Sequence, residues 1–107
     1  LKESGATIAA GTDFGGSRLM RMGTNALELE LLVKYSGFTS MEAITAATIN
    51  GAKACAMEEK IGSIEEGKTA DLIIVDGNPL EDIKRLQDTN RIKMVIKEGT
   101  IAVDRGL

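Results

Sequence analysis

The sequence predicts an α/β fold in which a short strand and two helical segments precede a small β unit. Three observations support this prediction: a run of small and apolar residues at 7–12, helical periodicity with capping signals between residues 25 and 57, and short apolar runs after Lys60. A chain of 107 residues is long enough for one compact domain. We expect residues 1–58 and residues 59–107 to form two parts of different character.

The first predicted element is a strand over residues 7–12, within "TIAAGTD". Small residues along a strand suit a crowded interior such as the wall of a barrel. Asp13 then lies just beyond the carboxyl end of the strand, at the start of a glycine-punctuated loop. A complete (β/α)8 barrel needs roughly 200 residues or more, so this sequence alone can hold only part of one.

The segment "NALELELLVKYSG" predicts a helix that begins after Asn25 and closes at Gly37. Asn25 with Glu28 matches a capping box. Leu27, Leu31 and Tyr35 share one face, and further leucines widen this apolar stripe. We therefore expect neighbours on more than one side of this helix.

A second capping box, Thr39 with Glu42, predicts another helix over residues 40–57. Its alanines favour close packing against a neighbouring element. Gly51 lies inside this segment and argues against an unbroken helix. Cys55 lies among small residues, which favours a buried apolar thiol over a reactive one.

The remaining sequence predicts strands and turns. A turn at Glu66 and Gly67 precedes "ADLIIVD", which we expect to be a strand covered on both faces because its residues do not alternate in polarity. Pro79 suits the first position of a short helical turn after Asn78. Residues 91–103 predict a hairpin with Gly99 in its turn.

Composition excludes several classes of partner. The net charge of −3 comes from interspersed charges, and aromatic residues make up 3% of the chain, so we expect no nucleic-acid partner. No stretch approaches the roughly 18 apolar residues of a membrane span, and the N-terminus lacks a signal-peptide pattern. We expect a cytoplasmic protein that does not bind membranes, and the initial Leu1 suggests that the natural start lies elsewhere.

Asp13 is the strongest candidate for chemistry. A carboxylate at the end of a barrel strand, flanked by Gly11 and Gly15, can bind a metal ion or accept a proton from water. The alternative is a structural role, in which the carboxylate accepts backbone N–H bonds in a glycine-rich loop. A phosphate site is a poor explanation, because the glycines follow no Walker pattern and the carboxylate would repel the anion.

Four stretches in order resemble the C-terminal portion of a metal-dependent amidohydrolase of the imidazolonepropionase-like group, which includes metallo-dipeptidases with prolidase activity. These stretches are "GTDFG" at 11–15, "SMEAITAATINGAKA" at 40–54, "IGSIEEGKTADLIIVDGNPLEDI" at 61–83 and "RIKMVIKEGTIAV" at 91–103. The resemblance implies that residues 1–58 are the end of a TIM (β/α)8 barrel, with strand 8, a loop and two helices. It implies that residues 59–107 are part of a small composite β-sandwich, in which Gly67 and Asp71 are structural.

The resemblance also implies that Asp13 binds a catalytic metal and shuttles a proton. The family's other ligands are mainly histidines, often with a carboxylated lysine, from earlier strands, whereas this sequence contains no histidine. A catalytic zinc site needs about three protein ligands. We therefore expect one or two divalent ions, most simply zinc, in the intact enzyme and no tightly held metal on this chain alone.

Two arginines in the loop after Asp13 are candidates for substrate binding. Arg18 or Arg21 can hold a substrate carboxylate through two parallel hydrogen bonds, which suits a peptide C-terminus. The alternative for each is an arginine that simply faces solvent.

Two hypotheses about function follow. In the first, the chain is the C-terminal fragment of a hydrolase that cleaves a C–N bond of a small amide, cyclic amide or dipeptide, and the fragment alone is inactive. In the second, it is a non-catalytic module that self-associates through exposed apolar helix faces. We expect a homo-oligomer in either case.

Overall fold

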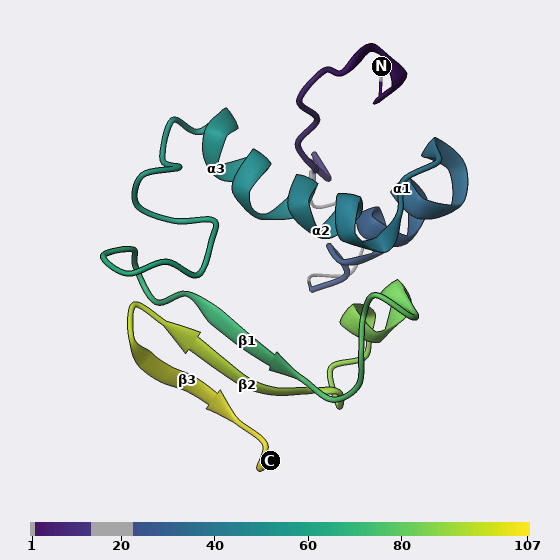
Figure 1. Cartoon of the computed structure of the whole chain (residues 1–107). Helices are drawn as coiled ribbons and strands as arrows, with labels where there is room; N and C mark the ends of the chain where they lie inside the picture. The colour runs from purple at the N-terminus through teal and green to yellow at the C-terminus, as the bar shows by residue number, and fades with distance from the viewer. Residues whose placement is uncertain (1, 14–22) are drawn as a thin grey trace.

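The computed structural model describes residues 2–13 and 23–107, and these form a helical layer that lies over a small sheet (Figure 1). The N-terminal segment runs along the helices, and the C-terminus lies beyond the sheet. The elements in chain order are η1 (Lys2–Ser4), α1 (Leu27–Ser36), α2 (Ser40–Ala47), α3 (Ile49–Ala54), β1 (Leu72–Val75), η2 (Ile83–Gln87), β2 (Ile92–Lys97) and β3 (Thr100–Asp104). The predicted order of a helical part followed by a β unit is thus observed.

The ends of α1 show one correct and one wrong prediction. Gly37 ends the helix with a left-handed backbone (φ 70°), and its N–H bonds to the Leu32 carbonyl, as a glycine C-cap should. The capping box at Asn25 is wrong: the N-cap is Ala26, with no side-chain hydrogen bond. Instead, the Asn25 amide donates to Thr12 Oγ1 at 3.4 Å. The reason is that Asn25 has a tertiary partner, which displaces the local cap.

The second helical segment begins as predicted and breaks one turn earlier than expected. Thr39 Oγ1 accepts a hydrogen bond from the Glu42 backbone N–H at 3.1 Å, which satisfies one of the free donors at the start of α2. The break lies at Thr48 (φ −113°, ψ −95°), between α2 and α3, rather than at Gly51. The Thr48 hydroxyl donates to the Ile44 carbonyl at 2.8 Å, a side-chain bond that competes with the helical pattern.

The core is small and lies between α1, α2 and η2. Its buried residues are Leu29, Phe38, Ala43, Ala46 and Ile83, and Ile8 and Ala10 pack against them. Ala43 and Ala46 of α2 are fully buried, because their small side chains allow close approach of the neighbouring elements. The stripe predicted on α1 is not covered by the described residues: Leu27, Leu31 and Tyr35 are 42%, 39% and 71% exposed.

Residues 7–12 do not form a strand, which corrects the prediction for this segment. A strand requires a ladder of hydrogen bonds to a neighbouring strand. Within the described part of the chain, the partner of this segment is instead the helical layer, where the Ala10 N–H bonds to the Ala46 carbonyl at 2.9 Å. The chain over residues 6–13 is therefore held by helices.

The described strands form an antiparallel three-stranded sheet in the order β1-β2-β3. Glu98 (φ 51°) and Gly99 (φ 79°) both have positive φ in the turn between β2 and β3, the pattern of a tight hairpin turn, as predicted for Gly99. Asp71 supports this turn, because its carboxylate accepts the Glu98 N–H at 2.9 Å. Asp71 is thus structural, as the resemblance implies.

Two further predictions need correction, and a third is confirmed in part. β1 is not covered on both faces by the described residues, since it lies at the sheet edge and Ile73 is 51% exposed. The turn predicted at Pro79 is present, since the Asn78 side chain accepts the Leu80 N–H and the Asn78 carbonyl accepts the Glu81 N–H, but the 3-10 helix η2 begins only after Asp82, which accepts the Lys84 N–H. Cys55 is exposed, because it follows the last residue of α3 where the chain turns away.

None of the helices in the described residues combines the length and apolar character needed to cross a membrane.

Candidate functional site

Asp13 stands at the end of an extended segment that the helical layer holds in place. Its backbone is left-handed (φ 44°), an uncommon conformation for a residue other than glycine. The residue is exposed, so its carboxylate is accessible to a ligand. Strained backbone of this kind is often found at functional positions.

Contacts from three parts of the helical layer fix the residues before Asp13. The Ala10 N–H donates to the Ala46 carbonyl at 2.9 Å. The Asn50 side-chain amide donates to the Ile8 carbonyl at 2.9 Å, a partly buried bond between residues 42 apart in sequence. Asn25, just before α1, bonds to Thr12. The position of Asp13 is thus determined by residues far from it in sequence.

A pocket of about 490 Å³ lies beside this segment. Residues 10–12 form one wall, the start of α1 forms another, and Ala47 closes it from α2. Glu28 lines this pocket, whereas the sequence had assigned it to a helix cap. Asp13 is the residue that directly follows this pocket wall in the sequence.

The described residues do not complete a metal site. Among residues 2–13 and 23–107, no group of three or more His, Cys, Asp and Glu side chains is arranged to hold an ion. Asp13 supplies one oxygen-donor side chain, and a catalytic zinc needs about three protein ligands. The donor set of this chain therefore does not fit a complete metal centre.

Arg18 and Arg21, the predicted substrate-binding residues, lie outside the described residues.

A cluster around Lys2 fastens the N-terminal segment to the helices. Lys2 Nζ donates to the Gly37 carbonyl at 2.7 Å and lies 2.9 Å from the Glu42 carboxylate. It also lies 5.7 Å from the centroid of the Phe38 ring. The hydrogen bond from Lys2 holds the pKa of the Glu42 carboxyl below its ordinary value of 4.5. These contacts are structural. They join Lys2 to the C-terminal end of α1 at Gly37 and to the first turn of α2 at Glu42.

The loop before β1 contains a second charged cluster. Lys68 Nζ donates to Ser63 Oγ at 2.7 Å and lies 2.9 Å from the Glu65 carboxylate, which also accepts a hydrogen bond from the Ser63 hydroxyl. The Ser63 hydrogen bond, with help from Lys68, lowers the pKa of the Glu65 carboxyl. Lys68 donates to the Ser63 oxygen and the Ser63 hydroxyl donates to Glu65, so these three side chains stabilise the loop.

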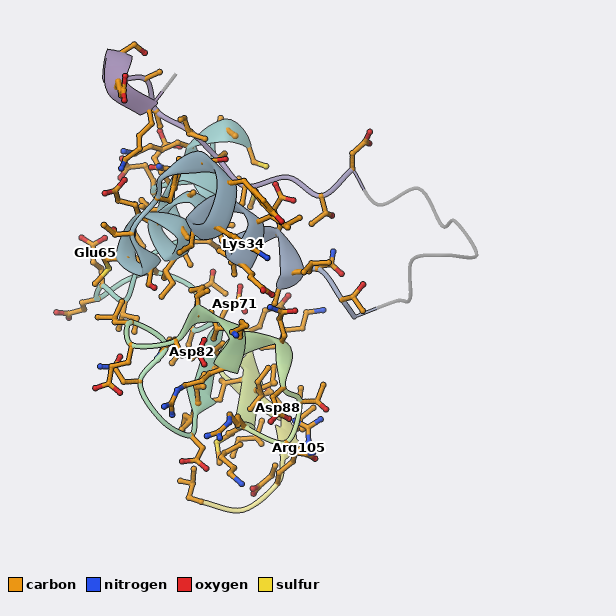
Figure 2. The ribbon with its side chains drawn as sticks, turned by 90° about the vertical axis from the view of Figure 1, so that its right-hand side faces the viewer. Lys34, Glu65, Asp71, Asp82, Asp88 and Arg105 are labelled. Atoms are coloured by element: carbon orange, nitrogen blue, oxygen red, sulfur yellow. The ribbon has the colours of Figure 1, made fainter. Side chains whose placement is uncertain are left out.

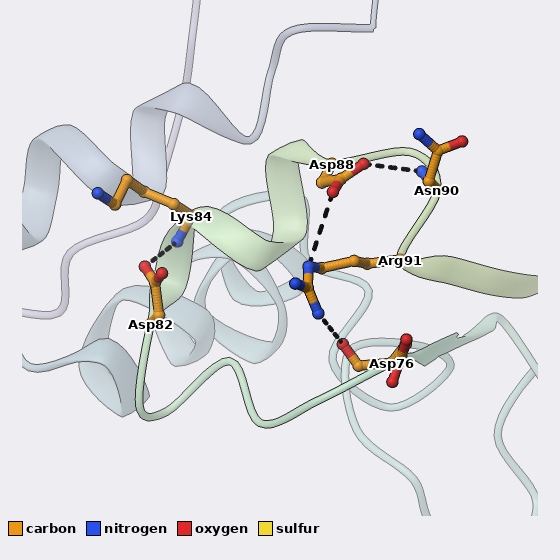
Figure 3. Close-up of polar contacts among 6 residues, drawn as sticks. All are labelled: Asp76, Asp82, Lys84, Asp88, Asn90 and Arg91. Carbon is orange, nitrogen blue, oxygen red and sulfur yellow. Dashed lines mark hydrogen bonds and ion pairs between the residues drawn. The ribbon is translucent and has the colours of Figure 1, made fainter.

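The acidic residues near η2 are also occupied by structural contacts. Figure 3 shows Asp82 accepting the Lys84 N–H and Asp88 accepting the Asn90 N–H, while Arg91 reaches Asp88 and the Asp76 carbonyl. The labelled carboxylates of Asp71, Asp82 and Asp88 are spread over the sheet half (Figure 2). Each of these three carboxylates stabilises a turn or a helix start.

Sequence reasoning missed Asn25 and Asn50. The sequence pattern around Asn25 predicts a helix cap, and no local motif marks Asn50. The signal for Asn50 is weak, since it is only an amide side chain within the alanine-rich run "AATINGAKA".

A family model described as "Amidohydrolase family" matches residues 1–102. The imidazolonepropionase of Thermoplasma volcanium is 40% identical over 77 residues, which cover 72% of this chain and 19% of that protein. The ochratoxinase of Aspergillus niger is 38% identical over 106 residues, which cover 98% of this chain and 21% of that protein. The chain thus spans about a fifth of the length of these relatives.

Solved structures agree with the sequence relatives. A putative prolidase from Bifidobacterium longum matches with a TM-score of 0.87 and 36% identity, over 98% of this chain and 25% of that one. A Xaa-Pro dipeptidase with bound methionine matches with a TM-score of 0.82 and 45% identity, over 94% of this chain and 23% of that one.

Proposed function

Since this chain belongs to the amidohydrolase family, we propose that it forms the C-terminal portion of a metal-dependent hydrolase that cleaves a C–N bond of a cyclic amide or a dipeptide. Its relatives are hydrolases of amide and dipeptide bonds. The single observation that supports the proposal is the exposed Asp13, which directly follows residues that the helices hold beside a pocket.

In this proposal, Asp13 moves the proton. Its carboxylate accepts a proton from the attacking water and then gives that proton to the leaving nitrogen of the cleaved bond. The role requires a fixed position, which the bonds to residues 8–12 provide.

A bound metal would polarise the substrate carbonyl and activate water. The sequence has no histidine, so this chain would contribute Asp13 and the remaining ligands would come from elsewhere in the whole protein. One or two zinc ions remain our proposal for the metal. Arg18 and Arg21 remain proposed contacts for a substrate carboxylate, and a cytoplasmic location stays a prediction.

The test uses the whole protein that carries this sequence, assayed against dipeptides and cyclic amides. Asp13→Asn removes the base with little change in size, and kcat is expected to fall by about 10²- to 10⁴-fold. Asp76→Asn is the matched control, because Asp76 is also exposed and its backbone carbonyl makes the contact to Arg91. Undiminished hydrolysis by Asp13→Asn, with the metal still bound, would refute the proposal.

The second candidate is a module that self-associates without catalysis. The observation that favours it is the exposed stripe of Leu27, Leu31 and Tyr35 on α1. Sedimentation separates the two candidates when combined with the whole-protein assay. Self-association of a whole protein that hydrolyses no amide and holds no metal would support the module.

A further inference from the structure

The junction of α2 and α3 holds the segment that leads to Asp13. Because the helix breaks at Thr48, the last turn of α2 and the first turn of α3 present separate groups to this segment. The Ala46 carbonyl accepts from the Ala10 N–H, and the Asn50 amide donates to the Ile8 carbonyl, both at 2.9 Å.

These two bonds reproduce the pattern of a neighbouring strand. In an extended chain, the carbonyl of one residue and the N–H two residues later point to the same edge. Ile8 and Ala10 are related in this way, so Ala46 and Asn50 bond along one edge of the segment. The side-chain amide of Asn50 thus supplies the donor that a strand backbone would provide.

We propose that Asn50 is a positioning residue for Asp13, an inference that rests on the proposed function. Asp13 follows Ala10 by three residues, so the two bonds set its place along the segment. A slip of one residue in an extended chain sends each side chain to the opposite face. Without the Asn50 donor, the Ala10 bond, the weaker Thr12 contact and the packing of Ile8 and Ala10 on the core remain to hold this register among the described residues.

A small displacement of a catalytic carboxylate has large kinetic consequences. A shift of about 1 Å can cost about 10²-fold in rate, and loss of a group that orients a metal ligand typically weakens metal binding about 10- to 100-fold. Asn50 is partly buried, lies on α3 and bonds to the Ile8 carbonyl. Its effect would therefore act through the backbone of residues 8–13.

The experiment uses Asn50→Asp in the whole protein, because this change keeps the shape and removes the donor. We expect kcat to fall about 10- to 100-fold and the zinc dissociation constant, measured by chelator competition, to rise by a similar factor. Asn90→Ala is the control, since the Asn90 backbone, rather than its side chain, bonds to Asp88. Ile83→Val is a second control, which lowers stability in the core without removing the hydrogen bonds to Ile8 and Ala10 and is expected to leave the zinc constant unchanged.

Asn50→Gln keeps the amide donor and is expected to lose no more than about threefold in kcat. The inference is overturned if folded Asn50→Asp binds zinc and turns over like the unmodified protein. It is equally overturned if folded Asn50→Gln loses tenfold or more in kcat. This second variant provides the test if Asn50→Asp does not fold. If the unmodified protein neither binds zinc nor hydrolyses amides, the proposed function itself fails, and the two failures are thereby distinguished.

Discussion

Replacing Gly62 with alanine tests how tightly the loop after α3 packs against that helix. Gly62 has φ +97°, and a Cβ atom there would lie 2.8 Å from Ala52 Cβ and 3.0 Å from Ile49 Cα. The left-handed backbone costs a non-glycine residue about 1–2 kcal/mol. Overpacking against atoms of a helix adds about 1–3 kcal/mol, because Ile49 Cα is backbone and cannot move alone. The expected total loss is about 2–5 kcal/mol.

Gly67→Ala separates the two costs. Gly67 has φ +89°, yet no atom lies within 4 Å of a Cβ built there, so only the backbone cost of about 1–2 kcal/mol applies. With a urea slope of about 1.5 kcal/mol/M, the unfolding midpoint of Gly62→Ala should lie about 0.7–2 M below that of Gly67→Ala. Midpoints that agree within about 0.3 M, with equal slopes, would refute the packing argument.

Two further predictions concern α2 and its contact with the N-terminal segment. Thr39→Ala removes the acceptor of the Glu42 N–H, so the free energy of unfolding should fall by about 1 kcal/mol in urea titrations; no loss would mean that solvent replaces the cap fully. The hydrogen bond from Lys2 lowers the pKa of the Glu42 carboxyl in the folded protein. The ionised pair therefore stabilises the fold fully above about pH 4.5, the ordinary pKa of the group. This stabilisation is lost as the pH falls through the lower pKa of the folded state. Lys2→Met should remove this part of the acid sensitivity when unfolding midpoints are compared between about pH 6 and about pH 3, and an unchanged pH profile would contradict the assignment.

The elements that the sequence predicts well have determinants within a few residues. Thr39 and Glu42 form a cap across one helical turn, and Gly37 and Gly99 supply positive φ where the chain must turn. Such signals depend only on local backbone geometry. The resemblance to amidohydrolases is confirmed, because the family model matches residues 1–102. The motifs that carry this resemblance are also short stretches of sequence that follow one another in order.

The errors occur where tertiary partners override local signals. Asn25 leaves its expected capping role because Thr12 offers a bond from across the loop. The apolar run around Ile73 has the same sequence pattern whether or not other residues cover the faces of β1. The exposure of Ile73 therefore cannot be predicted from the sequence. Residues 7–12 have strand-like composition, but their hydrogen-bond partners lie on helices.

The candidate site divides in the same way. Asp13 is a candidate because it lies between glycines after an apolar run and because the stretch "GTDFG" resembles the amidohydrolases, and both signals are local. The groups proposed to position Asp13 cannot be predicted from local sequence, because the bond from Asn50 to Ile8 joins residues 42 apart in the sequence. Glu28 likewise reaches the pocket wall only because α1 folds beside residues 10–12.

The apolar surface of the chain bears on the proposed site as well. Tyr35 on α1, with Ile73 and Ile101 on the sheet, are 71%, 51% and 55% exposed, and exposed apolar groups on both layers favour further protein packed against them. The matched relatives are four to five times as long as the aligned part of this chain. In the proposed enzyme, the segments that cover these side chains belong to the same polypeptide that supplies the remaining metal ligands. Burial of Tyr35 and completion of the site around Asp13 should therefore occur together, and a whole protein that leaves Tyr35 exposed while binding zinc through Asp13 would separate the two.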